Sequence, residues 1–171
     1  MKREFWQFWQ SGQFYFKGLP PEEADITPEW NSELRRSLQI WGPEAVNARG
    51  VIALISNLYR FIEVFAFARR LSAKEIYPDE INIEVTLSNA LGYVLTTDSS
   101  RLLRPMREVT SAAPITVATK TNPIEIQEDL RSLTLRAFNR MLETCFGWTD
   151  LPEDAFAGDY DKIIEEARYQ I

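Results

Sequence analysis

The sequence predicts an α+β domain in which a small antiparallel sheet of three to four strands packs against several helices. Two long segments, residues 51–72 and 127–146, repeat apolar residues every three or four positions, as one face of a helix requires. Between them, residues 81–87 alternate apolar and polar side chains, which is typical of a half-buried strand. Because the strands cluster instead of alternating with helices, an antiparallel sheet is favoured over a parallel one.

The first forty residues are expected to form an aromatic segment, a short strand and a helix. Phe5, Trp6 and Trp9 stand at positions that can share one helical face. A strand is expected over residues 13–17. A helix is expected over residues 27–40, because it opens with Thr-Pro, and these residues suit a cap and the first helical position.

The segment 51–72 is the strongest helix prediction in the chain. Its apolar face consists of Leu54, Leu58, Phe61, Phe65 and Ala68. The width of this face predicts a central, buried helix. Its start stays open, because the β-branched pair Val51 and Ile52 also suits a short strand over residues 50–55.

Three strands are expected in the middle of the chain. The first covers residues 81–87, with Ile81, Ile83, Val85 and Leu87 on its buried side. A turn at residues 88–90 leads to a second strand over 91–96. Residues 97–113 are expected to be irregular, and a third strand covers 114–119.

The C-terminal third predicts two helices. The helix over 127–146 places Leu130, Leu133, Ala137, Met141 and Cys145 on one face, with Phe138 and Leu142 beside them. Gly147 stands where a left-handed C-cap residue belongs. An acidic linker follows, and Asp159 is expected to cap a last helix over 160–169. We therefore expect a single domain over residues 1–171, with an acidic linker and helix over 150–171.

Composition restricts the chemistry of the chain. It has 171 residues, a net charge of −6, one cysteine and no histidine. No intrachain disulfide can form, and no imidazole base or metal ligand exists. The acidic balance disfavours nucleic acid as a partner, because phosphate binding depends on clustered Lys and Arg. No secretory signal or membrane span is evident, so we expect a cytoplasmic chain without membrane contact.

Motifs that carry chemistry are missing from the sequence. The seven glycines have no phosphate-cradle spacing, and no acidic residue stands two positions before a lysine, as many metal-dependent nucleases require. We expect no catalytic residue, no cofactor and no bound metal. One enzyme alternative remains open, a histidine-free metal-dependent hydrolase that uses Asp79, Glu80 and Glu84. The acidic residues are otherwise interpreted as solvated surface, and Cys145 as a small core residue.

Two surfaces are candidates for contact with partners. Arg101, Arg104, Arg107 and Lys120 could contact phosphates, although solvated arginines are the favoured interpretation of this cluster. Aromatic residues crowd the first sixteen positions without basic residues between Phe5 and Phe16. Burial in the core or in an interface is therefore favoured over base stacking. The expected contacts with a protein partner, or with a second copy of the chain, are Trp6, Trp9, Phe14 and Phe16.

Three segments together resemble part of a known family. Residues 5–14 resemble a "YQSGQF"-like run, residues 58–71 resemble an "LYRxTEIFEFAARL"-like helix, and residues 146–148 resemble an "FGW" helix ending. The helix departs from the pattern at Phe61-Ile62, where Thr normally precedes Glu. These segments occur in the region after the DNA-binding module of bacterial Schlafen/AlbA-type proteins. The resemblance implies an accessory domain in a bacterial defence or nucleic-acid context, without the DNA-binding module.

Overall fold

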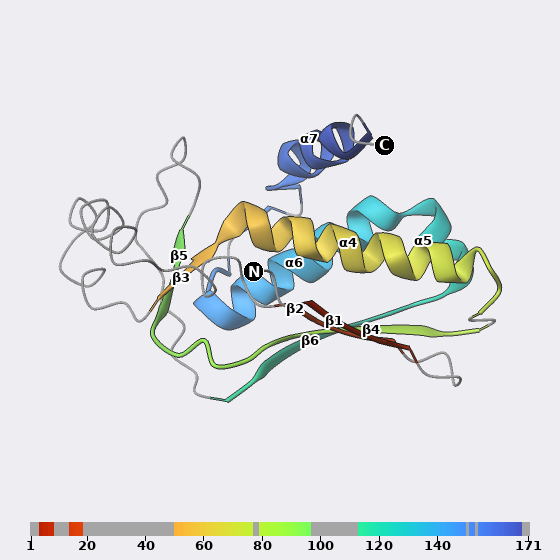
Figure 1. The fold of residues 1–171 in the computed structure, drawn as a ribbon. Helices are drawn as coiled ribbons and strands as arrows, with labels where there is room; N and C mark the ends of the chain where they lie inside the picture. The colour runs from red at the N-terminus through yellow and green to blue at the C-terminus, as the bar shows by residue number, and fades with distance from the viewer. Residues whose placement is uncertain are drawn as a thin grey trace. The chain divides into compact units, whose positions relative to one another are not determined.

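The computed structural model confirms the α+β class (Figure 1). It describes residues 4–8, 14–18, 50–76, 79–96, 113–149, 151–152 and 154–168. The chain divides into two compact units. The first comprises Met1–Leu54 and Leu91–Thr110, and the second comprises Ile55–Ala90 and Ser111–Ile171. That both belong to a single domain stays a prediction.

The first unit contains a two-stranded antiparallel ribbon near the N-terminus. Strand β1 (Glu4–Phe8) pairs with β2 (Phe14–Gly18) over five residue pairs. The strand expected over residues 13–17 is thus confirmed, but the helical interpretation of Phe5 and Trp6 is wrong. Aromatic residues favour extended backbone, and a run this short fits either period. Trp9 and the helix expected over 27–40 lie outside the described residues.

The same unit contains a parallel pair of strands, β3 (Gly50–Ala53) and β5 (Tyr93–Thr96). The sequence predicted β5 as part of the antiparallel sheet, and this pairing is wrong. Two adjacent residues of β5, Val94 and Leu95, are both buried. A strand that is covered on both faces suits a parallel pair better than a half-exposed antiparallel sheet. The chain reaches β5 through Asn89 and Gly92, which both have positive φ angles.

The second unit places an antiparallel strand pair against helices. Strands β4 (Ile81–Leu87) and β6 (Ile115–Thr121) pair along their full length, and helix α6 (Leu130–Phe146) packs on β6 (Figure 1). The predicted strand over 81–87 is confirmed with its alternation, since Ile81 and Ile83 are buried and Asn82 and Glu84 are exposed. In the described residues this small sheet has two strands.

Helix α4 (Leu54–Ser72) contributes one buried apolar face to the core. All five residues of its predicted face are buried, namely Leu54, Leu58, Phe61, Phe65 and Ala68. The alternative of a short strand before the helix is also confirmed, because β3 ends where α4 begins. No helix in the described part of the chain is both long and apolar enough to cross a membrane.

The helix expected over 127–146 is confirmed as α6, which begins at Leu130, whereas residues 127 and 128 belong to a separate short helix, α5 (Pro123–Glu128). Asn122 caps α5, because its Oδ1 accepts hydrogen bonds from the two amides at positions 124 and 125 (3.0 and 2.9 Å). Asp129 belongs to the hydrogen bonding of both helices. Its amide donates to the carbonyl of Glu125 in α5 (2.8 Å), and its carbonyl accepts from the amide of Leu133 in α6 (3.1 Å). Gly147 closes α6 in the left-handed conformation (φ 62°), as the sequence predicts.

The last helix, α7 (Ala157–Arg168), begins earlier than the sequence predicted. Asp159 lies in its first turn and does not precede it, so the predicted cap is wrong. The amide of Ala157 donates to the carbonyl of Asp154 at 2.9 Å, and the amide of Tyr160 donates to the carbonyl of Phe156 at 2.9 Å. The chain therefore turns into the helix through backbone hydrogen bonds.

Candidate functional site

The β1–β2 ribbon brings predicted contact residues into direct register. Trp6 stands opposite Phe16, and Phe8 stands opposite Phe14. Because successive residues of a strand alternate between the two faces of a sheet, these four positions belong to one face of the ribbon. We call positions 6, 8, 14 and 16 the aromatic face. It includes three of the four residues that the sequence predicts as partner contacts.

The opposite face of the ribbon has a different composition. Its paired positions are Phe5 with Lys17 and Gln7 with Tyr15, so each aromatic residue stands opposite a polar one. The aromatic face, by contrast, pairs aromatic with aromatic twice. Phe8 was not among the predicted contacts, although the spacing of two between Trp6 and Phe8 is the signal of a shared strand face.

Of the predicted phosphate contacts, Lys120 lies within the described residues. Lys120 lies on β6, and its Nζ is 3.4 Å from Oε1 of Glu80, with both side chains well exposed (70% and 63%). An exposed pair of this length contributes little to stability. Arg101, Arg104 and Arg107 lie outside the described residues. The neighbour that the structure gives Lys120 is thus a carboxylate.

The carboxylates of the hydrolase alternative are spread over a surface. Asp79, Glu80 and Glu84 are all exposed. Glu84 accepts a hydrogen bond from Nδ2 of Asn82 at 2.9 Å, and Glu80 faces Lys120. Within the described ranges, no three acidic or cysteine side chains gather closely enough to hold a metal ion.

Cys145 is buried on the apolar side of α6, where the sequence placed it. Its Sγ lies 2.9 Å from Sδ of Met141, one turn earlier in the helix. Burial raises the pKa of the Cys145 thiol to about 11. A nucleophilic cysteine needs a lowered pKa and access to substrate, so this environment is that of a core residue.

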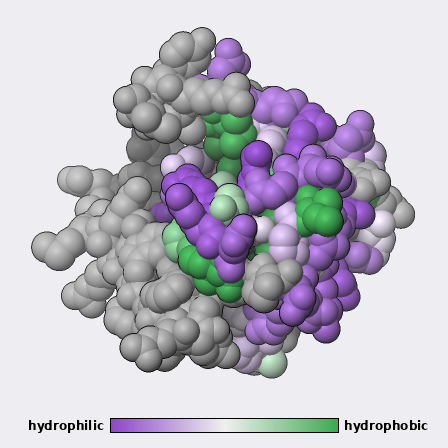
Figure 2. Space-filling view, turned by 90° about the vertical axis from the view of Figure 1, so that its right-hand side faces the viewer, coloured by the Kyte–Doolittle hydropathy of each residue, from purple (hydrophilic) through white to green (hydrophobic). Residues whose placement is uncertain are grey.

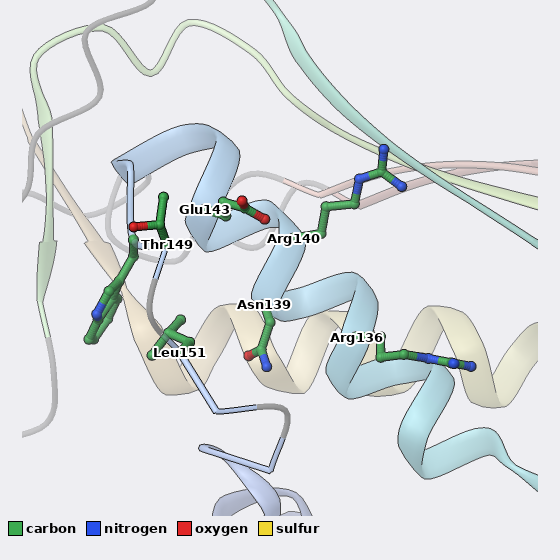
Figure 3. A pocket seen from close by; sticks show the side chains of 7 residues that line it. Arg136, Asn139, Arg140, Glu143, Thr149 and Leu151 are labelled. Atoms are coloured by element: carbon green, nitrogen blue, oxygen red, sulfur yellow. The ribbon is translucent and has the colours of Figure 1, made fainter.

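A shallow pocket lies beside the C-terminal half of α6, where the chain turns back after Gly147 (Figure 3). Its volume is about 250 Å³. The residues that line it are Arg136, Asn139, Arg140, Glu143, Trp148, Thr149 and Leu151. In Figure 3, Asn139 points toward the segment that carries Leu151, whereas Arg136 and Arg140 extend away from it.

The pocket has more the character of a surface notch than of an active site. Ligand pockets for small molecules usually enclose about 300–1,000 Å³ and bury most of the ligand. Nδ2 of Asn139 donates to the carbonyl of Pro152 at 3.1 Å, and Arg136 lies 3.6 Å from Glu125. Asn139 therefore contacts the segment 148–152, and Arg136 contacts the neighbouring helix α5.

Described residues on one face of the molecule are mainly polar (Figure 2). On the face that Figure 2 shows, hydrophobic atoms of the described residues form a few separate patches among hydrophilic ones. Among the residues whose side chains the structure describes, the exposed large apolar ones are Tyr59, Ile76, Leu91 and Ile124. Single exposed apolar residues are ordinary on a protein surface. The aromatic face differs from these single residues, because its register brings four aromatic positions together.

Comparison of the chain with family models, with curated proteins and with solved structures gives no match.

Proposed function

We propose that this chain is a non-catalytic protein-interaction domain, and that it contacts a protein partner or a second copy of itself through the aromatic face of the β1–β2 ribbon. The observation that carries the proposal is the register of the ribbon, which pairs Trp6 with Phe16 and Phe8 with Phe14. Aromatic residues are enriched at the centres of protein interfaces, where they supply much of the binding free energy.

The size of the ribbon supports the same proposal. A hairpin of two strands is marginally stable by itself and needs a hydrophobic partner for its apolar face. Four aromatic positions on one face demand such a cover. The resemblance to the region after the DNA-binding module of Schlafen/AlbA-type proteins is consistent with an accessory role in a larger bacterial assembly.

The chemistry of the chain supports a role in binding over one in catalysis. The sequence has no histidine, and its one cysteine is buried with a raised pKa. General acid–base and nucleophilic catalysis draw chiefly on groups with a pKa near the operating pH. These properties support the proposal of a domain that acts by contact.

The test compares substitutions on the two faces of the ribbon in the full chain. Trp6→Ser and Phe16→Ser remove aromatic rings from the aromatic face, and Phe5→Ser and Tyr15→Ser are matched controls on the opposite face. Size-exclusion chromatography with light scattering measures self-association. A pull-down with the full chain isolates candidate partner proteins, and calorimetry with each purified partner measures binding. We expect the first pair to weaken the complex about 30-fold or more, as loss of an interface hot spot does.

Two outcomes would contradict the proposal. The first is a chain that is monomeric at all accessible concentrations and retains no protein partner. The second is an equal loss of binding in all four variants, because that result would reflect unfolding of the ribbon instead of loss of a contact. Circular dichroism of each variant separates the second case from a specific effect.

A further inference from the structure

Helix α7 is attached to the rest of the second unit by an aromatic contact just before its first turn. Phe156 is buried between two rings, those of Phe138 on α6 and Trp148 in the segment after it. The ring centroids are 5.3 Å apart for Phe138 and 6.4 Å apart for Trp148, and both contacts are edge-to-face. Phe156 therefore joins α7 to the helix and to the pocket wall at the same point.

Two further attachments follow at Tyr160 and Asp161, the fourth and fifth residues of α7. Tyr160 is buried and shares a hydrogen bond with Thr134, which has no exposed surface. Asp161 accepts two hydrogen bonds from Arg131, at 2.9 Å from Nε and 2.7 Å from Nη2. Beyond Tyr160 the burial decreases up to residue 165, since Ile163 and Ile164 are half-buried and Glu165 is exposed. Among these described side chains, the buried one is that of Tyr160, near the N-terminal end of the helix.

The local sequence of α7 makes its helical state depend on these attachments. A helix of 12 residues is marginal in water when it stands alone. Gly158 lies in its first turn, where it lowers the helix propensity. Figure 1 shows α7 beyond α4 and α6, at the end of the connecting segment. Segments with few attachments open more easily than the core that they cover.

We propose that α7 is a releasable latch, in which residues 154–168 undock and lose their helix as one unit while α4, α6 and the β4–β6 pair stay folded. Release uncovers the rings of Phe138 and Trp148. It also removes the ring that contacts Trp148, which lines the pocket beside α6.

Native-state hydrogen exchange of the full chain, followed by mass spectrometry, tests the latch. We expect the amides of residues 157–168 to exchange together, about 100-fold faster than the buried amides of α6. Phe156→Ala should accelerate exchange in 157–168 by at least about tenfold and leave residues 54–72 unchanged. Gly158→Ala should slow exchange in α7 about two- to fivefold, because no atom lies within 4 Å of the added methyl group.

The same exchange measurement includes a control variant. Ile124→Ala, an exposed position on α5, should alter no segment. Should Phe156→Ala fail to fold, Gly158→Ala and Asp161→Asn carry the test with opposite expected signs. Equal exchange rates in α6 and α7 would overturn the proposal. So would a response to Gly158→Ala or Asp161→Asn that spreads equally over α4, α6 and α7, since the latch would then open only with the whole unit.

Discussion

Phe156 meets the edge of the Phe138 ring at a centroid distance of 5.3 Å and an angle of 79°. Phe138 makes a second edge contact, with Phe61 of α4 at 5.4 Å and 71°, and it is only 1% exposed. One residue of α6 thereby joins the helix before the sheet to the helix at the C-terminus. Edge-to-face aromatic pairs contribute about 0.5–1.5 kcal/mol each beyond the area that they bury.

Phe138→Ala is expected to be the most destabilising single truncation in this row of rings. It removes both aromatic contacts and leaves a cavity, so the free energy of unfolding should fall by about 3–5 kcal/mol. Urea unfolding followed by circular dichroism measures this change. Ile124→Ala removes a side chain that is 69% exposed and should change stability by less than about 0.5 kcal/mol. Similar losses in the two variants would contradict the assigned core.

We expect a glycine-to-alanine substitution to have opposite effects on stability at Gly147 and at Gly158. Gly147 has φ 62° at the end of α6, so Gly147→Ala should cost about 1 kcal/mol of stability. Gly158 lies within α7 in open space, so Gly158→Ala should increase stability by about 0.4–1 kcal/mol. Thermal and urea unfolding of the two variants measure both effects. Effects of the same sign would contradict the assigned helix boundaries.

Cys145 should be nearly inert toward thiol reagents in the folded chain. Burial raises its pKa from 9.0 to about 11, which lowers the thiolate fraction at pH 8 roughly 100-fold. A chromogenic disulfide reagent should therefore react slowly in buffer and fully in denaturant. Since the raised pKa favours the neutral thiol, its contribution to stability is lost only as the pH rises from 9.0 through about 11. Fast reaction in native buffer would show that the residue is accessible.

Because Tyr160 is a buried phenol with a raised pKa, we expect α7 to lose stability at alkaline pH. Burial raises the pKa of this phenol, and the nearby Asp161 adds to this effect, although Arg69, Arg131 and the hydrogen bond with Thr134 oppose it. A raised pKa in the docked state means that stability is fully present below the ordinary value of about 10 and decreases as the pH rises through the docked value.

The measurement for Tyr160 compares the native chain with Tyr160→Phe. Helix content between pH 8 and 11 should fall more steeply in the native chain, because the variant has no phenol to ionise. At neutral pH the variant should be less stable by about 0.5–1.5 kcal/mol, since it lacks the hydrogen bond to Thr134. Identical pH profiles would show that Tyr160 stays protonated or solvated without effect on α7.

The elements with a full hydrophobic period were predictable from the sequence. The residues of α4 at Leu54, Leu58 and Phe61 repeat at helical spacing and are buried as expected. The alternation at Ile81 and Ile83 likewise gives the buried face of β4. In both cases one face of a regular element meets the core, and the sequence pattern reports that face directly.

Pairing and boundaries were less predictable because they depend on contacts between distant residues. The sequence around Val94 and Leu95 does not indicate that their strand pairs in parallel with β3. Asp129 interrupts a segment that has helical periodicity on both sides, and its backbone serves two helices. The backbone at Trp6 is extended in a run too short to separate the periods of helix and strand.

The candidate site was predictable by residue type and not by arrangement. The aromatic excess predicted Trp6, Phe14 and Phe16 as candidate contact residues. The register then adds Phe8 and separates these positions from Phe5 and Tyr15 on the other face. Strand register fixes which residues share a face, and the sequence of a short hairpin leaves it open.

Photo-crosslinking from the ribbon tests the interaction proposal most directly. A photoreactive phenylalanine analogue is placed at position 16 on the aromatic face, or at position 15 on the opposite face, in the full chain. We expect crosslinks from position 16 to a partner protein or to a second copy, and far fewer from position 15. Crosslinks from position 16 only to residues of the same chain would contradict it, because the aromatic face would then be part of the chain's own core.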